Sequence, residues 1–232
     1  MFLDPLYMLI LLVAGGLSLW ASFLTRSRFK HYARIGASSG MTGEQAARAM
    51  LNHEGLHEVG IERVGGFLSD HYDPRSRVLR LSPDVHDGRS LSAIGVACHE
   101  AGHALQHAQQ YAPLSLRSTL VPAASIGSNL SPYILMLGLF MGAGGKTVML
   151  AGIILLAASV LFTLVTLPVE YDASARARSH IVMAGIVTPQ EEPDVGRVLN
   201  AAFLTYLAAA ISAVMTLVYW LLRSGLLGGR DD

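Results

Sequence analysis

Residues 96–107, VACHEAGHALQH, carry three histidines and one glutamate and stand between a hydrophilic region and the longest uncharged run of the chain. A helix is predicted here because the Ser90 side chain can cap its start and Pro113 should end it. We expect this helix to cover residues 91–110. The chain therefore places a histidine-bearing helix directly before a segment that avoids water.

The histidines of this helix are spaced for binding a metal ion. His99 and His103 lie four positions apart and share one helical face, with Glu100 beside them. His107 shares that face, but at about 1.5 Å per residue it is about 12 Å along the axis from His99, too far for one ion. Two neutral imidazoles suit zinc, and a carboxylate that does not bind the metal can accept a proton from activated water. We expect His99 and His103 as ligands and Glu100 as general base; the alternative is that the histidines only form hydrogen bonds.

Four stretches contain no Asp, Glu, Lys or Arg, and each can cross roughly 30 Å of hydrocarbon. With 52% hydrophobic and 15% charged residues, the composition is too apolar for an ordinary soluble domain. The first stretch lacks a preceding basic region and exceeds a typical signal-peptide core, so an uncleaved anchor is favoured. We expect transmembrane helices at residues 5–25, 118–141, 147–169 and 198–222.

The basic residues predict the orientation in the membrane. Of 17 Lys and Arg, 11 lie in residues 26–117 and 3 in residues 170–197. Both segments should face the cytoplasm, because Lys and Arg concentrate on that side of membrane proteins. The lone cysteine, Cys98, suits a reducing compartment, and the zero net charge gives no indication of nucleic-acid binding. We expect a multi-pass protein of the cell membrane.

The hydrophilic segment before the histidine helix predicts a small sheet or hairpin. Strand-like pieces, VGIERVGG and RVLRLS, flank the turn-forming segment LSDHYDPRS, and an amphipathic helix capped by Thr42 should cover residues 41–52. The RVLRLS strand could present an edge to an extended peptide substrate. An interior position without a role in substrate binding is the alternative.

A third zinc ligand should come from another helix, and Glu170 is the candidate. It directly follows the third uncharged run, where a carboxylate beside a membrane needs a partner. If the second and third runs form an antiparallel hairpin, Glu170 returns to the side of His99. A carboxylate that meets only solvent or Arg176 is the alternative.

HEAGHALQH, with LSDHYDPRSRVLRLS upstream and LPVEYDASARA downstream, resembles the YugP-type membrane zinc metallopeptidases of bacteria. The likeness covers nearly the whole chain, including the order of the four spans. More distantly, the arrangement is similar to the membrane gluzincins of the heat-shock and CAAX-processing type, where a histidine pair and a glutamate on a following helix hold zinc. The resemblance implies a mainly α membrane protein with a cytoplasmic gluzincin-like domain. It also implies one Zn²⁺ held by His99, His103 and Glu170, with Glu100 as the base.

The wider gluzincin pattern has an aspartate, four residues after the ligating glutamate, that supports a ligand. Ser174 stands at that place here and Asp172 two positions earlier, so both are candidates for orienting a ligand. His71, Arg176 and His180 are candidates for donating to the oxyanion or binding substrate, because they carry donors in segments expected near the zinc.

Together these features predict a zinc endopeptidase that hydrolyses membrane or membrane-proximal proteins at the cytoplasmic face. Its partners would be a protein substrate, the lipid bilayer and a regulatory membrane protein. A non-catalytic, zinc-stabilised adaptor or assembly factor is the alternative, although holding a metal requires no free carboxylate at Glu100. A zinc transporter is disfavoured because the spans contain no charged residue or histidine in their interior.

Overall fold

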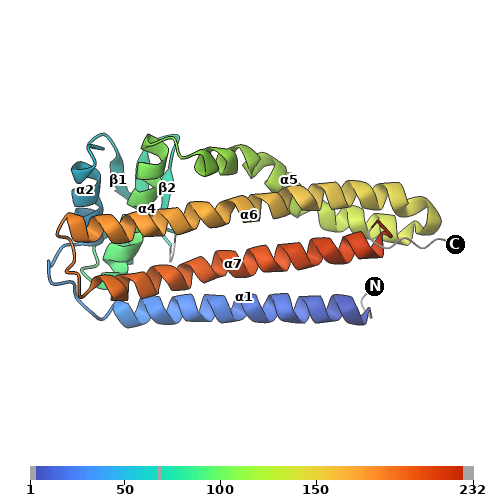
Figure 1. Ribbon diagram of the computed structural model, residues 1–232, viewed down its shortest axis with the longest axis horizontal. Coiled ribbons are helices and arrows are strands. Elements are labelled where there is room, and N and C mark those ends of the chain that lie inside the picture. The colour runs from blue at the N-terminus through green and yellow to red at the C-terminus, as the bar shows by residue number, and fades with distance from the viewer. Residues whose placement is uncertain (1–3, 67–68, 227–232) are drawn as a thin grey trace. The chain divides into compact units, whose positions relative to one another are not determined.

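The computed structural model describes residues 4–66 and 69–226, which form long helices and one small sheet (Figure 1). Leu68, the first residue of the predicted turn segment, lies outside the described residues. In chain order the elements are α1 (Pro5–Tyr32), α2 (Gly43–His53), β1 (Gly60–Arg63), β2 (His71–Asp73), β3 (Val78–Leu81), α3 (Pro83–His86), α4 (Leu91–Ala108), α5 (Ala112–Phe140), the 3₁₀ turn η1 (Gly142–Gly145), α6 (Lys146–Met183) and α7 (Glu192–Arg223).

Four helices, α1, α5, α6 and α7, are long and apolar enough to cross a membrane. This confirms the expected mainly α protein with four transmembrane helices and a small sheet. All four helices continue past the uncharged runs: α1 extends to Tyr32, α5 begins at Ala112, α6 continues through Glu170 to Met183, and α7 begins at Glu192. Charged residues end an apolar run without ending a helix, because the backbone hydrogen bonds continue wherever helix-forming residues follow.

Two compact units divide the chain, and one of them holds residues 4–20, 115–167 and 206–226 among those described. In this unit α5 and α6 form an antiparallel hairpin, joined through η1. A Cβ atom at Gly127 would lie 2.2 Å from the Leu155 carbonyl oxygen, and one at Gly138 would lie 2.6 Å from the Met149 side chain. Such close backbone approach is typical of small residues at helix interfaces in membranes.

The second unit holds residues 21–114 and 168–205 and contains the sheet. The strand order is β1-β3-β2, with β1 parallel and β2 antiparallel to β3. The RVLRLS segment therefore forms the central strand, so that of the two alternatives the interior position is the one that the structure shows. Leu79 and Leu81 of β3 are fully buried in the core of this unit. The edges belong to β1 and β2.

Helix α4 lies in the core of this second unit, beside α2 (Figure 1). Its cap is the predicted one, since Ser90 Oγ accepts a hydrogen bond from the Ala93 amide at 3.2 Å. It ends at Ala108, two residues before the predicted end, because Gln110 adopts a left-handed conformation with φ 53°. Pro113 then lies in the first turn of α5, where its missing N–H costs no hydrogen bond.

Candidate metal centre

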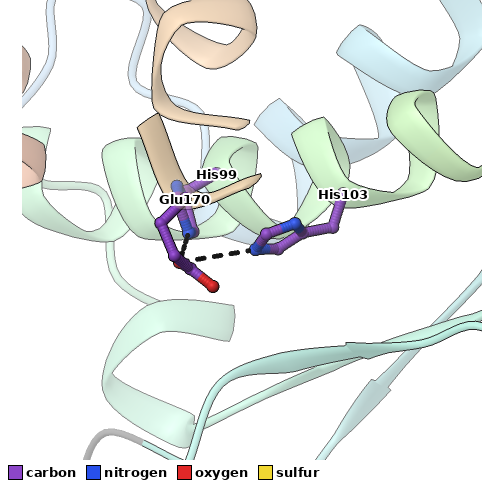
Figure 2. A group of neighbouring side chains, drawn as sticks. All are labelled: His99, His103 and Glu170. Carbon is purple, nitrogen blue, oxygen red and sulfur yellow. Dashed lines mark hydrogen bonds and ion pairs between the residues drawn. The ribbon is translucent and has the colours of Figure 1, made fainter. Parts of the chain in front are cut away.

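Helices α4 and α6 bring three side chains together that could hold a metal ion. His99 and His103 project from α4 and Glu170 projects from α6, so that their polar ends converge (Figure 2). Glu170 Oε2 lies 3.2 Å from Nε2 of His99 and 3.7 Å from Nε2 of His103. One ligand atom from each residue lies within 4.8 Å of the other two. The predicted set of three is therefore the set that the fold assembles.

Close packing at Gly102 places α6 against α4 at this point. A Cβ atom at Gly102 would lie 2.5 Å from the carbonyl oxygen of Ala173, a backbone atom that cannot turn aside. Ala173 and Ala177 on the facing side of α6 are fully buried and also small. These small residues let Glu170 reach the histidines of the neighbouring helix.

The second nitrogen of each histidine is held by a hydrogen bond, which directs Nε2 toward Glu170. His99 Nδ1 lies 3.1 Å from Ser174 Oγ, and His103 Nδ1 lies 2.9 Å from Gln106 Oε1. Ligating histidines commonly use such a contact to fix the ring orientation and tautomer. Ser174 therefore contacts a candidate ligand directly.

Gln106 is a polar residue of the site that sequence reasoning missed. Its amide nitrogen donates to the Val169 carbonyl and to Asp172 Oδ2, each at 2.8 Å. Both partners accept hydrogen bonds only, so the amide oxygen must be the atom that faces His103 Nδ1. Asp172 thus reaches the site through Gln106. The available signal was a glutamine three residues after His103, on the ligand-bearing face of the helix.

Glu100 lies within this centre and keeps its carboxylate free. Its side chain is buried, with 8% exposed, and it forms no hydrogen bond or ion pair with any residue in the described ranges. Burial lowers the pKa of His103, but the neighbouring carboxylates of Glu170 and Glu100 outweigh this and raise it above its ordinary value. A proton therefore competes with a metal ion for His103.

The neighbouring Cys98 takes no part in this chemistry. Burial raises the pKa of its thiol, so the thiol stays protonated. It packs within the apolar core around α4.

The three candidate donors are placed differently from one another. Arg176 Nε lies 2.5 Å from Asp172 Oδ2, and its guanidinium lies over the Tyr111 ring. His180 donates through Nδ1 to the Arg176 carbonyl, and its Nε2 lies 3.1 Å from Glu54 on the turn after α2.

The remaining donor candidate, His71, is exposed on the edge strand β2 and donates through Nδ1 to the Ser69 carbonyl at 2.8 Å. His107, which helix geometry excluded as a ligand, accepts or donates a hydrogen bond at 2.9 Å with the Tyr72 hydroxyl.

Comparison with known proteins agrees with this centre. A family model described as "Putative neutral zinc metallopeptidase" matches residues 7–225. A curated relative, "Putative membrane protease YugP" of Bacillus subtilis (strain 168), is 44% identical over 227 residues, which are 98% of this chain and 99% of that protein. This chain belongs to the neutral zinc metallopeptidase family. No solved structure matches it.

The donor atoms fit the metal that the family name specifies. Two imidazole nitrogens and one carboxylate oxygen are ligands that zinc takes in catalytic sites, where three protein ligands leave a fourth position open. In this zinc metallopeptidase the group consists of His99, His103 and Glu170. The two hydrogen bonds to Nδ1 leave the Nε2 atoms as the nitrogens that would bind the ion.

Proposed function

We propose that this chain is a zinc-dependent endopeptidase that hydrolyses peptide bonds of membrane or membrane-proximal proteins at the cytoplasmic face. The observation that carries the proposal is the carboxylate of Glu100, which forms no hydrogen bond or ion pair with the described residues and stands next to a metal-binding group. A purely structural metal site has no use for such a group, because holding the ion requires only the ligands. A general base that exchanges protons with water, by contrast, requires a carboxylate that no other residue occupies.

The chemistry divides between the metal and the chain. Zinc, when bound, supplies a Lewis acid that activates water and polarises the substrate carbonyl. His99, His103 and Glu170 hold the ion, and Glu100 accepts the proton of the attacking water. The same carboxyl group then delivers this proton to the leaving amine.

Of the donors proposed for the oxyanion, His71 is the one we retain. Arg176 is engaged with Asp172, and His180 is engaged with Glu54, so both serve the packing of α6. His71 lies on an edge strand and uses only Nδ1 in its hydrogen bond to Ser69. Its Nε2 can therefore contact a substrate.

The placement of Glu170 supports membrane-associated substrates. It is the first residue after the uncharged run 147–169, and both belong to the single helix α6. A ligand next to an apolar run keeps the zinc close to the bilayer, where the tails and loops of membrane proteins are accessible. The excess of Lys and Arg in the two hydrophilic segments supports the cytoplasmic side.

The test separates metal binding from hydrolysis. We expect Glu100→Gln to retain one zinc per chain while cleavage of a membrane-tethered substrate falls by roughly 10²- to 10⁴-fold, the usual contribution of a general base. Zinc is measured by elemental analysis of the purified full-length protein. Glu58→Gln, at an exposed carboxylate, is the matched control and should retain both properties. Equal cleavage by wild type and Glu100→Gln would refute the hydrolytic assignment and favour the adaptor alternative.

Gln106 is proposed as a positioning residue for both His103 and α6. Replacing it with methionine keeps the volume but removes all three hydrogen bonds, so we expect zinc affinity to fall by roughly 10- to 100-fold. Gln106→Glu can still accept from His103 but cannot donate to Val169 or Asp172, and it should also weaken binding. Zinc affinity is measured by competition with a chelator.

A rescue experiment distinguishes positioning from packing at Gln106. In the double variant Gln106→Glu with Asp172→Asn, the asparagine amide can donate to the new carboxylate and restore the chain of hydrogen bonds to His103. We expect the double variant to bind zinc more tightly than Gln106→Glu alone. If the loss of zinc affinity in the double variant equals the sum of the losses in the two single variants, the proposed role of Gln106 is contradicted.

A further inference from the structure

The last two turns of α1 and the turn that follows the helix carry four cations that the protein itself does not neutralise. Arg26, Arg28, Lys30 and Arg34 are exposed, and their side chains form no hydrogen bond or ion pair within residues 4–66 and 69–226. Other arginines of the same unit are paired, as in Arg63–Asp87, Arg80–Asp73, Arg178–Glu192 and Arg197–Asp194. Helix α1 contains no acidic residue, and like charges four positions apart repel one another. A counter-charge from outside the chain would relieve this repulsion.

Three of these cations line one hollow on the helix surface. Arg26, Lys30 and Arg34 surround an open groove of about 450 Å³ with Phe23, Ser27 and His31. Arg26 and Lys30 lie four residues apart on one face of α1, and Arg34 follows in the turn after the helix. Arg28 does not line the groove, although it lies in the same turns of the helix.

The same face of α1 is apolar and exposed just before the groove. Trp20 is 54% exposed and Phe23 is 73% exposed, and these aromatic side chains lie three positions apart. They end the uncharged run of α1, where aromatic residues are typical of the boundary between hydrocarbon and headgroups. Along α1 the exposed surface thus changes from aromatic to cationic side chains. Only a ligand with an apolar part and an anionic part can contact both.

We propose that this groove binds the headgroup of an anionic glycerophospholipid. Arg26, Lys30 and Arg34 contact the phosphodiester, and the acyl chains lie along Trp20 and Phe23. A free phosphate or another soluble polyanion would neutralise the cations but would leave the aromatic side chains exposed. The site is independent of the zinc centre and does not depend on peptidase activity.

Trp20 provides a reporter for this lipid. The chain contains two tryptophans, and Trp220→Phe leaves Trp20 as the remaining one. The full-length protein is reconstituted in phosphatidylcholine vesicles that contain dibrominated phosphatidylglycerol or, in parallel, dibrominated phosphatidylcholine at the same mole fraction. We expect the anionic brominated lipid to quench Trp20 fluorescence more strongly.

The groove is tested by removing one charge inside it, in the turn after α1, and one charge outside it, on α1 itself. Arg34→Gln should weaken the relative binding of phosphatidylglycerol by about fivefold, since each cation near an anionic surface contributes roughly that factor. Arg28→Gln removes the same charge outside the groove and should weaken the preference less than Arg34→Gln does. Both side chains are exposed, and circular dichroism should show an unaltered helical content.

Three results would overturn the proposal. Equal quenching by the two brominated lipids in the Trp220→Phe parent would show that the headgroup is not recognised. An equal loss of preference in Arg28→Gln and Arg34→Gln would assign the effect to overall charge rather than to the groove. Loss of the preference on adding millimolar inorganic phosphate, at constant ionic strength, would identify a free-phosphate site.

Discussion

Glu170→Gln should abolish stoichiometric zinc binding by the purified protein and, with it, peptidase activity. The substitution preserves the shape of the side chain but removes the negative charge that faces two imidazoles, at 3.2 Å from His99 and 3.7 Å from His103. Two neutral histidines alone hold zinc weakly, because zinc sites in proteins need at least three protein ligands. Elemental analysis measures the stoichiometry, and thermal unfolding with and without zinc measures the coupling, since a ligand at about 1,000 times its Kd stabilises by roughly 4.1 kcal/mol.

The chain offers a matched control for this substitution. Glu54 also faces a histidine, with Oε1 at 3.1 Å from Nε2 of His180, but this pair lies outside the metal-binding group. Glu54→Gln should therefore retain zinc and the zinc-dependent rise in unfolding temperature. If Glu170→Gln retains one tightly bound zinc, the assignment of the third ligand is wrong.

The candidate ligands could be predicted from sequence because each depends on a short-range rule or a simple chain path. The four-residue spacing of His99 and His103 decides that they share a face, whatever the rest of the fold does. Glu170 required one further assumption, that the second and third apolar runs form a hairpin. The contacts of Gly127 with Leu155 confirm that hairpin.

The remaining features depend on tertiary packing, which local patterns do not encode. The strand β3, with three apolar residues and one arginine, suits both an edge and an interior position, and only its pairing with β1 and β2 decides between them. In the sequence, Gln106 looks like an ordinary helical residue. Its role becomes visible only in the fold, where it donates hydrogen bonds to Val169 and Asp172 of α6. The long helices extend beyond their apolar runs because a charged residue indicates the boundary of the hydrocarbon region. It does not indicate the end of the helix.

Gly102→Ala should weaken zinc binding although no ligand is changed. In an isolated helix, alanine would be favoured over glycine by about 1 kcal/mol. Here the added Cβ would lie 2.5 Å from the Ala173 carbonyl oxygen, so α4 and α6 must move apart. Overpacking of this kind typically costs about 1–3 kcal/mol, and the separation also withdraws Glu170 from the two histidines. We expect a lower unfolding temperature and at least roughly tenfold weaker zinc binding, by the standard relation of about 1.4 kcal/mol per tenfold change.

A second glycine in a helix separates this effect from helix propensity. Gly16 lies in α1, and a Cβ atom there would meet nothing within 4 Å, so Gly16→Ala should leave zinc binding unchanged. The two variants make the same chemical change and differ only in what faces the new methyl group. Wild-type zinc affinity in Gly102→Ala would mean that α6 does not need this close approach to deliver Glu170. A loss at Gly102 alone would show that a glycine inside the HEAGH motif sets the distance between the two helices that carry the ligands.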